Sequence, residues 1–280
     1  MPPITRILFV LLLLLSPASF AQAQNVPQMA SQCQLIADGL GKTMPVRFEP
    51  ARSRAGPILF AQAQDQPVTI TYIGHSTFFI ETPGGITIAT DYNGWFTTPS
   101  LPTVVTMNKA HSSHYTMNPD PGIEHVLHGW GDDAKPADHD LVVGDAYIRN
   151  VPTDIRSWGG AMEENGNSIF IFEVAGLCIG HLGHLHHELT DQQYGEIGRL
   201  DVLMVPVDGG LTMGAESMSR VVKRLRSALI LPMHRPGPMV RQFVGMFGDD
   251  YDKVFADEAS LDVSLRSLPR RPTIHILAGL

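Results

Sequence analysis

The chain has 280 residues, of which 44% are hydrophobic and 17% charged, and its formal net charge is −8. This composition excludes collagen-like, coiled-coil and wholly disordered proteins. The acidic balance also argues against nonspecific nucleic-acid binding, which needs a basic face. The 12 histidines stand out beside only 2 cysteines. Histidine is the commonest metal ligand, and two cysteines cannot build a cysteine-ligated zinc site, so any metal is expected to be held by nitrogen and oxygen.

Residues 1–23 have the pattern of a secretory signal peptide. Arg6 precedes nine consecutive apolar residues, Ile7–Leu15, and Ala21–Ala23 offers an A-x-A cleavage site. Nine residues are too few to span a bilayer, although an uncleaved membrane anchor is the alternative. The mature protein is therefore predicted to be periplasmic or secreted.

Residues 24–66 are predicted to form an N-terminal extension of a domain that occupies residues 67–280. The extension shows no steady hydrophobic period, apart from a short helix predicted within Gln28–Leu40. Export permits a disulfide between Cys33 and Cys178. Because Cys178 lies in an apolar run, the favoured interpretation is a small buried hydrophobic residue without a disulfide.

The domain is predicted to begin with strands and then to alternate strands with helices. Strands are expected at Val68–Ile73, Thr77–Ile80, Ile86–Ala89, Val104–Thr106, Glu124–Leu127, Leu141–Val143, Tyr147–Val151, Ser168–Val174, Leu177–Gly180, Val202–Val205, Ala228–Leu231 and Thr273–Ile276. Pro83–Gly85 predicts a tight turn. Helices are expected after the capping box Thr190–Gln193, over Ala215–Ser227 and over Gly237–Phe247. This order fits helices layered on sheets.

Histidines follow three of the predicted strands directly. They are His111 and His114 after the first, His181, His184, His186 and His187 after the second, and His234 after the third. Loops at strand ends are where rigid scaffolds present ligands, and imidazoles gathered from several loops suit zinc. The tract 181–187 could instead be a metal-buffering surface patch. The histidines without a surrounding motif are expected to be structural: His125, His128, His139 and His275.

Six segments of the chain occur in the order found in a known enzyme family. They are Thr71–Ile80, Ile88–Asp91, Val105–His114, Gly180–Gly183, Val202–Pro206 and Leu231–His234. Together they resemble the metallo-β-lactamase-fold hydrolases, and most closely the ascorbate-6-phosphate lactonase-like, zinc-dependent branch. The resemblance covers about residues 68–235. It implies an α/β fold, an αββα sandwich with metal between the two sheet edges.

The first metal motif of that family, H-x-H-x-D-H, is altered in this chain. His111 and His114 match the second and third histidines, whereas Lys109 replaces the first and Ser113 replaces the aspartate. Thr153 stands where the family has its next histidine. The missing aspartate normally orients the attacking water, so the resemblance does not favour β-lactam hydrolysis.

The later metal motifs are partly retained. His184 follows Gly183 where the family has a bridging aspartate, and His234 matches the final ligand. We therefore expect one rebuilt zinc site in preference to two ions, with ligands His111, His114, His184 and His234, and His181 as a fifth candidate.

Further roles follow from the resemblance. Lys109 is expected to replace part of the charge of the missing cation and to stabilise an oxyanion. Asp91 is expected to orient the metal-binding loop by hydrogen bonds. His75 and Asp208 are the candidates for a general acid or base.

The function that these patterns predict is an exported hydrolase. A zinc-bound hydroxide would attack an ester, lactone or phosphoester of a small-molecule substrate. The alternative is a non-catalytic periplasmic metal- or ligand-binding protein that retains the fold. Phospholipid processing is a third hypothesis, with Trp95, Phe96 and Met213 as an exposed apolar patch; membrane contact is open but not predicted. The sequence does not fix the substrate, the metal identity or the oligomeric state.

Overall fold

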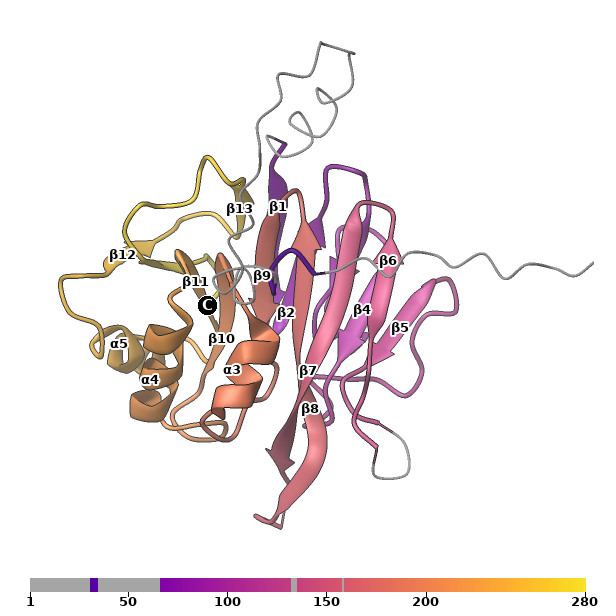
Figure 1. The fold of residues 1–280 in the computed structure, drawn as a ribbon, viewed down its shortest axis with the longest axis horizontal. Coiled ribbons are helices and arrows are strands. Elements are labelled where there is room, and N and C mark those ends of the chain that lie inside the picture. Colours follow the sequence, from indigo (N-terminus) through magenta and orange to yellow (C-terminus); the bar gives the residue numbers. More distant parts are fainter. Residues whose placement is uncertain (1–30, 35–65, 132–134, 158) are drawn as a thin grey trace, which may run out of the picture.

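The computed structural model describes residues 31–34, 66–131, 135–157 and 159–280. The predicted signal peptide and nearly all of the predicted extension lie outside these residues, and residues 32–34 of the expected 28–40 helix form a turn. Two β-sheets lie against each other, and the described helices cover one of them (Figure 1). No helix within the described ranges is long and apolar enough to cross a membrane.

The first sheet has six strands in the order β13-β1-β2-β3-β4-β5. They are β1 (Val68–Gly74), β2 (Thr77–Glu81), β3 (Thr87–Ala89), β4 (Val104–Met107), β5 (His125–His128) and β13 (Ser260–Val263). β2 pairs antiparallel with both β1 and β3, and β3 pairs parallel with β4. β1, β3 and β4 therefore run in one direction, and their carboxyl ends meet at one edge of the sheet.

The second sheet has eight strands in the order β12-β14-β11-β10-β9-β8-β7-β6. They are β6 (Asp140–Val143), β7 (Ala146–Arg156), β8 (Met162–Val174), β9 (Leu177–His181), β10 (Val202–Val207), β11 (Leu229–His234), β12 (Asp252–Phe255) and β14 (Thr273–Ile276). β10 pairs parallel with both β9 and β11. The loops that follow these three strands therefore leave the sheet at the same edge.

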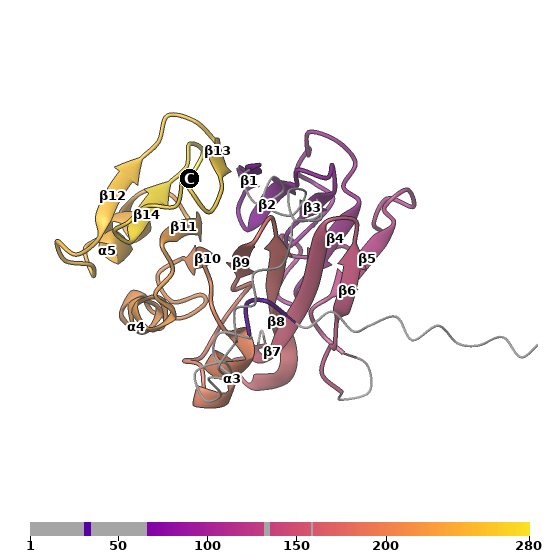
Figure 2. The ribbon, with the colours of Figure 1, turned by 45° about the horizontal axis from the view of Figure 1, so that its top comes forward.

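Three described helices lie on the outer face of the second sheet: α3 (Asp191–Ile197), α4 (Ala215–Leu225) and α5 (Pro238–Val244). Figure 2 shows them on the side of this sheet that faces away from the first. The predicted capping box is confirmed, because the Thr190 hydroxyl accepts from the Gln193 backbone and the Gln193 side chain accepts from the Thr190 backbone. The apolar stripe of α4 is confirmed too, since Met218, Val221 and Val222 are buried.

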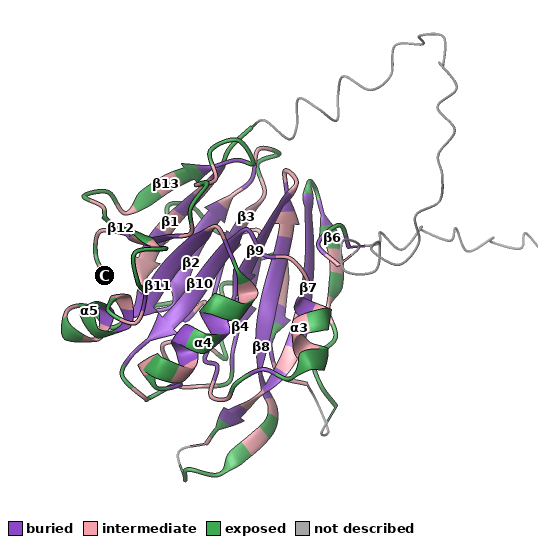
Figure 3. Cartoon of the chain, turned by 60° about the vertical axis from the view of Figure 1, so that its left-hand side comes forward, coloured by how far each residue is buried: buried purple, intermediate pink, exposed green. Residues whose placement is uncertain are grey.

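One hydrophobic core lies between the two sheets. Phe78 and Ile80 from the first sheet pack in one cluster with Phe170, Phe172 and Met204 from the second. A separate cluster fills the space between the second sheet and the helices. In Figure 3 the strands are mostly buried, whereas the helices are exposed on their outer faces. Alternating apolar positions on the strands thus explain the sandwich, which confirms the fold class.

Every predicted strand is present, although two strands were not predicted. β12 is exposed along its whole length, and β13 has one buried residue, so neither shows an apolar pattern. β7 and β8 are longer than predicted and form an extended hairpin. From the sequence, β7 was expected to end before Pro152. Proline lacks a backbone N–H donor, but the pairing of β7 with β8 continues beyond it.

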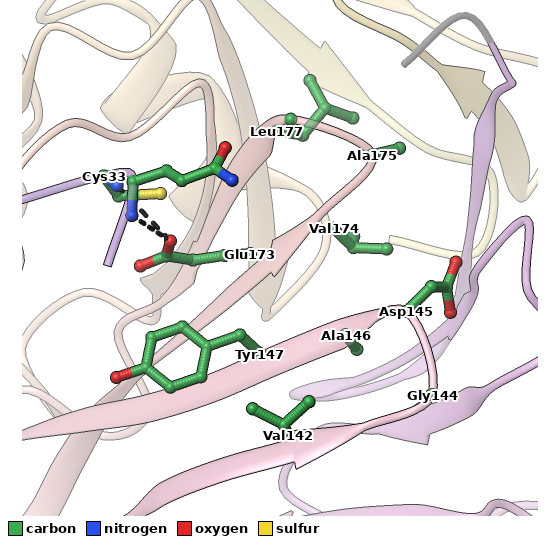
Figure 4. A pocket seen from close by; sticks show the side chains of 12 residues that line it. Cys33, Val142, Gly144, Asp145, Ala146, Tyr147, Glu173, Val174, Ala175 and Leu177 are labelled. Atoms are coloured by element: carbon green, nitrogen blue, oxygen red, sulfur yellow. Dashed lines mark hydrogen bonds between the residues drawn. The ribbon is translucent and has the colours of Figure 1, made fainter. Parts of the chain in front are cut away.

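The interpretation of Cys178 as a cysteine without a disulfide is wrong. Cys33 and Cys178 form a disulfide across 145 residues, which fixes the N-terminal segment to β9. Next to it, Glu173 of β8 accepts hydrogen bonds from the backbone nitrogens of Gln32 at 2.9 Å and Cys33 at 3.4 Å (Figure 4). Arg149 of β7 donates to the same carboxylate at 3.0 Å. Burial of Cys178 was expected from its apolar run. Its pairing with Cys33 could not be predicted, because the position of the N-terminal segment depends on the folded sheet.

Candidate metal centre

Five histidines from the two sheets meet at one end of the sandwich, where the parallel strands end. His75 lies in the turn between β1 and β2, and His111 and His114 lie in the loop after β4. From the second sheet, His184 follows β9 and His234 ends β11. Neighbouring rings of this five-histidine cluster have centroids 4.4 to 5.5 Å apart.

Three overlapping groups in this cluster could each hold a metal ion. They are His75, His114 and His234; His111, His114 and His184; and His184, Asp208 and His234. Within each group the ligand atoms lie within 4.8 Å of one another. Any two of the groups share a histidine, so filling one group removes a ligand from each of the others.

Asp91 orients the His114 ring through its Nδ1 atom. Its Oδ2 lies 2.6 Å from Nδ1 of His114, and both side chains are fully buried. Asn108, which directly follows β4, donates to the other carboxylate oxygen of Asp91 at 2.9 Å. With Nδ1 engaged, Nε2 of His114 faces Nε2 of His75 at 3.2 Å. Such a carboxylate–histidine pair is the usual support of a metal-binding imidazole.

Asp208 orients His234 in the same way. Its Oδ2 lies 2.9 Å from Nδ1 of His234, and Thr212 donates to the carboxylate through its backbone nitrogen and its hydroxyl. Nε2 of His234 is buried and has no hydrogen-bond partner among the described residues. A buried nitrogen without a partner costs free energy unless a ligand occupies it.

Among the described residues, Nδ1 of His184 is another buried nitrogen without a hydrogen-bond partner. The backbone of this residue is held by Asn167, whose Oδ1 accepts from the His184 backbone nitrogen at 2.7 Å. The preceding Gly183 has φ of +59°, and a Cβ there would overlap the side chains of Asn108 and Asn167. Glycine is therefore required for the turn that brings His184 to the cluster.

Ser113 supports His111, because its hydroxyl lies 2.7 Å from Nδ1 of His111. In the family motif this position carries an aspartate, so the serine occupies it as a hydrogen-bonding partner without a charge. Three cluster histidines thus have an Nδ1 partner, which favours Nε2 as the metal-facing atom in His111, His114 and His234.

Burial keeps four of the five cluster histidines neutral. Desolvation lowers the pKa of His75 to about 3, and it also lowers the pKa values of His111, His114 and His184. Burial alone would raise the pKa of Asp208, but the bonds from His234 and Thr212 outweigh it and hold that pKa below its usual value. Neutral imidazoles with an ionised carboxylate are the donor set that binds divalent cations.

Three residues of the site have a backbone conformation that non-glycine residues rarely adopt. The φ angles are +50° for His75, +42° for Asp91 and +88° for His234. The His234 backbone nitrogen donates to the carbonyl of His75 at 2.8 Å, and this bond joins the two sheets at the cluster. Strain of this kind typically occurs at functional sites that the surrounding fold holds in place.

Two of the residues named from the sequence lie outside the cluster. His181 has both ring nitrogens engaged, Nε2 with the Ser76 carbonyl at 2.9 Å and Nδ1 with the Gly183 backbone at 3.1 Å, so neither is available to a metal. Lys109 forms an ion pair with Glu163 and lines a different cavity. Its ammonium therefore neutralises Glu163 and does not lie in the histidine cluster, where it was expected.

Other expected residues have structural contacts. Thr153 accepts a hydrogen bond from Asn167 at 2.7 Å, so it supports the loop of His184. Met213 is only 6% exposed and cannot contribute to an exposed apolar patch, whereas Trp95 is 67% exposed. Sequence reasoning missed Asn108 and Asn167, because buried asparagines that link loops have no local pattern.

A cavity of about 620 Å³ opens beside the cluster. His111 and His184 line it together with His186, Arg156, Arg235 and Leu211. Because it is lined by His184, whose Nδ1 has no partner among the described residues, it is the candidate substrate cavity.

Known proteins resemble this chain across the region that forms the site. The family described as Beta-lactamase superfamily domain matches residues 69–234. A UPF0173 metal-dependent hydrolase of Anaeromyxobacter sp. (strain K) is 25% identical over 204 residues, which cover 59% of this chain and 73% of the relative. Another, from Pyrococcus abyssi, is 31% identical over 96 residues, which span 33% of this chain and 41% of that relative.

A solved structure is similar as well. The crystal structure of a proposed Zn-dependent hydrolase of the metallo-β-lactamase superfamily from Thermotoga maritima matches with a TM-score of 0.55 and 28% identity. The match covers 75% of this chain and 98% of the Thermotoga chain. The matched family region begins in β1 and ends at His234, and so contains the whole five-histidine cluster. The chain therefore belongs to the metallo-β-lactamase superfamily, and its relatives there are metal-dependent hydrolases.

Proposed function

We propose that the chain is an exported hydrolase that uses one zinc ion to cleave an ester, lactone or phosphoester. The observation that carries the proposal is the pair of buried, unpartnered nitrogens, Nδ1 of His184 and Nε2 of His234, within the five-histidine cluster. These nitrogens fit a cation that accepts imidazole ligands, and the Thermotoga neighbour supports zinc.

The overlap of the three ligand groups favours one ion. His114, His184 and His234 each belong to two groups. An imidazole nitrogen binds a single ion, so two ions could not both have complete sets of three from these groups. When bound, zinc would lower the pKa of a coordinated water to about 7 and polarise a substrate oxygen.

The residues of the chain supply the positioning. Asp91 and Asp208 fix the tautomers of His114 and His234 through their Nδ1 atoms. His75 stacks on His234 with ring centroids 4.4 Å apart and closes the cluster from the first sheet. It is thus placed as a further ligand candidate, in addition to its proposed role as an acid or base.

Export is supported by two independent observations. The first residues have the pattern of a signal peptide, and Cys33 and Cys178 form a disulfide. Disulfides form and persist in oxidising compartments such as the periplasm and the extracellular space.

A metal-binding protein without turnover is the second candidate. It is favoured by Ser113, which supports His111 but has no carboxylate to orient a water molecule. The two candidates differ in whether the bound zinc performs catalysis.

A chelator-controlled screen separates these functions. The zinc-loaded chain is assayed on aryl esters, lactones and phosphodiesters, before and after chelation and zinc readdition. We expect hydrolysis that chelation abolishes and zinc restores. The variant His114→Ala should lose it, whereas His125→Ala on β5, outside the cluster, should retain it. Full zinc occupancy without hydrolysis of any substrate would refute the hydrolase and support the binding protein.

A further inference from the structure

The cavity beside the cluster is positively charged although the chain is acidic. The formal net charge of the protein is −8. None of the described residues that line this cavity is an aspartate or glutamate, and two are arginines, Arg156 and Arg235. A cavity lined by one sign of charge concentrates ligands of the opposite sign.

These two arginines lack the acidic partners that five other described arginines have. Arg149, Arg199, Arg220, Arg224 and Arg271 each pair with a carboxylate. In the part of the chain that the structure describes, neither Arg156 nor Arg235 forms an ion pair. Their charges are therefore available to a ligand in the cavity.

Arg156 is held in position without being neutralised. Its Nη2 donates to the Thr212 carbonyl at 2.7 Å, and its backbone nitrogen donates to Nδ1 of His186 at 2.9 Å. Nε2 of His186 lies 2.8 Å from the Leu211 carbonyl. Nη2 of Arg156 also donates to the Gly210 carbonyl at 3.5 Å, so the end of β7 is joined to the loop after β10. Nε and Nη1 of Arg156 have no partner among the described residues. A fixed guanidinium loses little conformational entropy when it binds an anion.

Arg235 lines the same cavity and directly follows His234 in the chain. Its backbone nitrogen donates to the Val207 carbonyl at 3.3 Å, which fixes its backbone beside β10. Its side chain is exposed and makes no hydrogen bond with any described residue. Because it borders the cavity next to a proposed ligand, it can reach a group attached to the atom under attack.

We propose that Arg156 and Arg235 form a subsite for an anionic group, a carboxylate or phosphate, carried by the substrate close to the bond that is cleaved. This inference rests on the proposed hydrolase function and narrows its substrate class. The planar fork of a guanidinium matches the paired oxygens of both anions. A volume of about 620 Å³ suits a small molecule. Leu211, which is 54% exposed, offers an apolar wall for the uncharged remainder.

Binding of two probe anions tests the subsite directly. Inorganic phosphate and succinate are titrated calorimetrically into the full mature chain, in its zinc-loaded and its chelator-treated form. We expect at least one probe to bind both forms, and the tighter probe identifies the preferred anion. Arg156→Gln and Arg235→Gln should each weaken binding about tenfold or more, because each removes charge-assisted hydrogen bonds. The control Arg270→Gln, in the connection between β13 and β14 outside the cavity lining, should bind like the unchanged chain.

Two results would overturn the subsite. One is the absence of binding of both probes; the other is binding that neither cavity variant weakens, which would place the anion on the metal alone. Arg156 also holds a loop, so its variant is checked for a normal unfolding transition. The Arg235 side chain makes no hydrogen bond or ion pair with the described residues, and its variant keeps the test decisive if Arg156→Gln fails to fold.

A matched substrate pair separates this inference from the proposed function. Mono(4-nitrophenyl) succinate carries a free carboxylate, and its methyl ester does not. We expect a KM at least tenfold lower for the anionic ester, with the difference removed in Arg235→Gln. Equal hydrolysis of both esters by all variants would refute the subsite and leave the hydrolase intact. No hydrolysis together with arginine-dependent binding of the probes would refute the hydrolase and support the anion subsite.

Discussion

Asp208 accepts a hydrogen bond from Nδ1 of His234 at 2.9 Å, while Nε2 of the same ring has no partner among the residues that the structure describes. Asp208 directly follows β10 and His234 ends the neighbouring parallel strand β11, and the register of these strands pairs Val207 with His234. The carboxylate therefore fixes which nitrogen carries the proton and leaves the other free for a cation. This arrangement is the basis of the metal centre proposed for the chain.

Replacing the supporting carboxylate should weaken the metal without removing a cluster histidine. In Asp208→Asn, the charge that stabilises the Nδ1–H tautomer of His234 is lost. We expect the zinc affinity to fall by about 10- to 100-fold. Competition with a chromophoric chelator measures it. The control Asp262→Asn removes an exposed carboxylate that bonds Thr69 on the first sheet, and should leave the affinity unchanged. Equal affinities for the two variants would contradict the role of Asp208.

A glycine variant tests the turn that presents His184. Gly183→Ala adds a methyl group at a positive φ and into contact with the Asn108 and Asn167 side chains. Gly85→Ala is a matched control, since Gly85 has φ of +85° but open space around its Cβ position. We expect the control to lose about 1 kcal/mol of unfolding free energy and Gly183→Ala to lose about 1–3 kcal/mol more. Urea unfolding compares them, and equal losses would show that the packing around Gly183 does not constrain the turn.

The disulfide should contribute strongly to stability. Cys33 and Cys178 are 145 residues apart, and a crosslink over a long loop restricts the unfolded chain. We expect the double variant Cys33→Ser, Cys178→Ser to lose about 2–5 kcal/mol of unfolding free energy. Reductant should destabilise the unchanged chain by a similar amount and have no effect on the double variant. If reductant left the unchanged chain as stable as before, the crosslink would not form in solution.

Stability should also fall in mild acid because of His181. Burial lowers the pKa of this histidine, so the folded chain keeps it neutral while the unfolded chain takes up a proton below about pH 6.5. The contribution of neutral His181 to the free energy of unfolding is complete above that pH. It is lost as the pH falls toward the lowered pKa. Below about pH 6.5, the unfolding free energy of both metal-free proteins should fall with pH. The slope for the unchanged chain should exceed that for His181→Gln by about 1.4 kcal/mol per pH unit. Parallel pH profiles would show that His181 is protonated in the fold.

The buried strands and the histidine-bearing loops beside them could be predicted from the sequence. Buried strands such as β9 and β10 consist of apolar runs, and the histidines that follow β4, β9 and β11 are adjacent to them in the chain. Because the carboxyl ends of parallel strands share an edge, adjacency along the chain was enough to predict which loops carry the site.

Contacts between distant segments could not be predicted in this way. The predicted charge role of Lys109 depended on alignment with a motif, yet the structure pairs Lys109 with Glu163. Glu163 reaches it because β8 begins at Met162, several residues before the strand that its apolar pattern indicates. The pairing of Cys33 with Cys178 depends likewise on where the N-terminal segment crosses the second sheet.

Metal analysis of the purified mature chain tests whether the five-histidine cluster holds a single zinc ion. We expect one equivalent of zinc per chain, retained in His125→Ala and lost in both His114→Ala and His184→Ala, because these two histidines share one ligand group. Two equivalents per chain, each lost separately on substitution of a different histidine, would contradict a single-ion site.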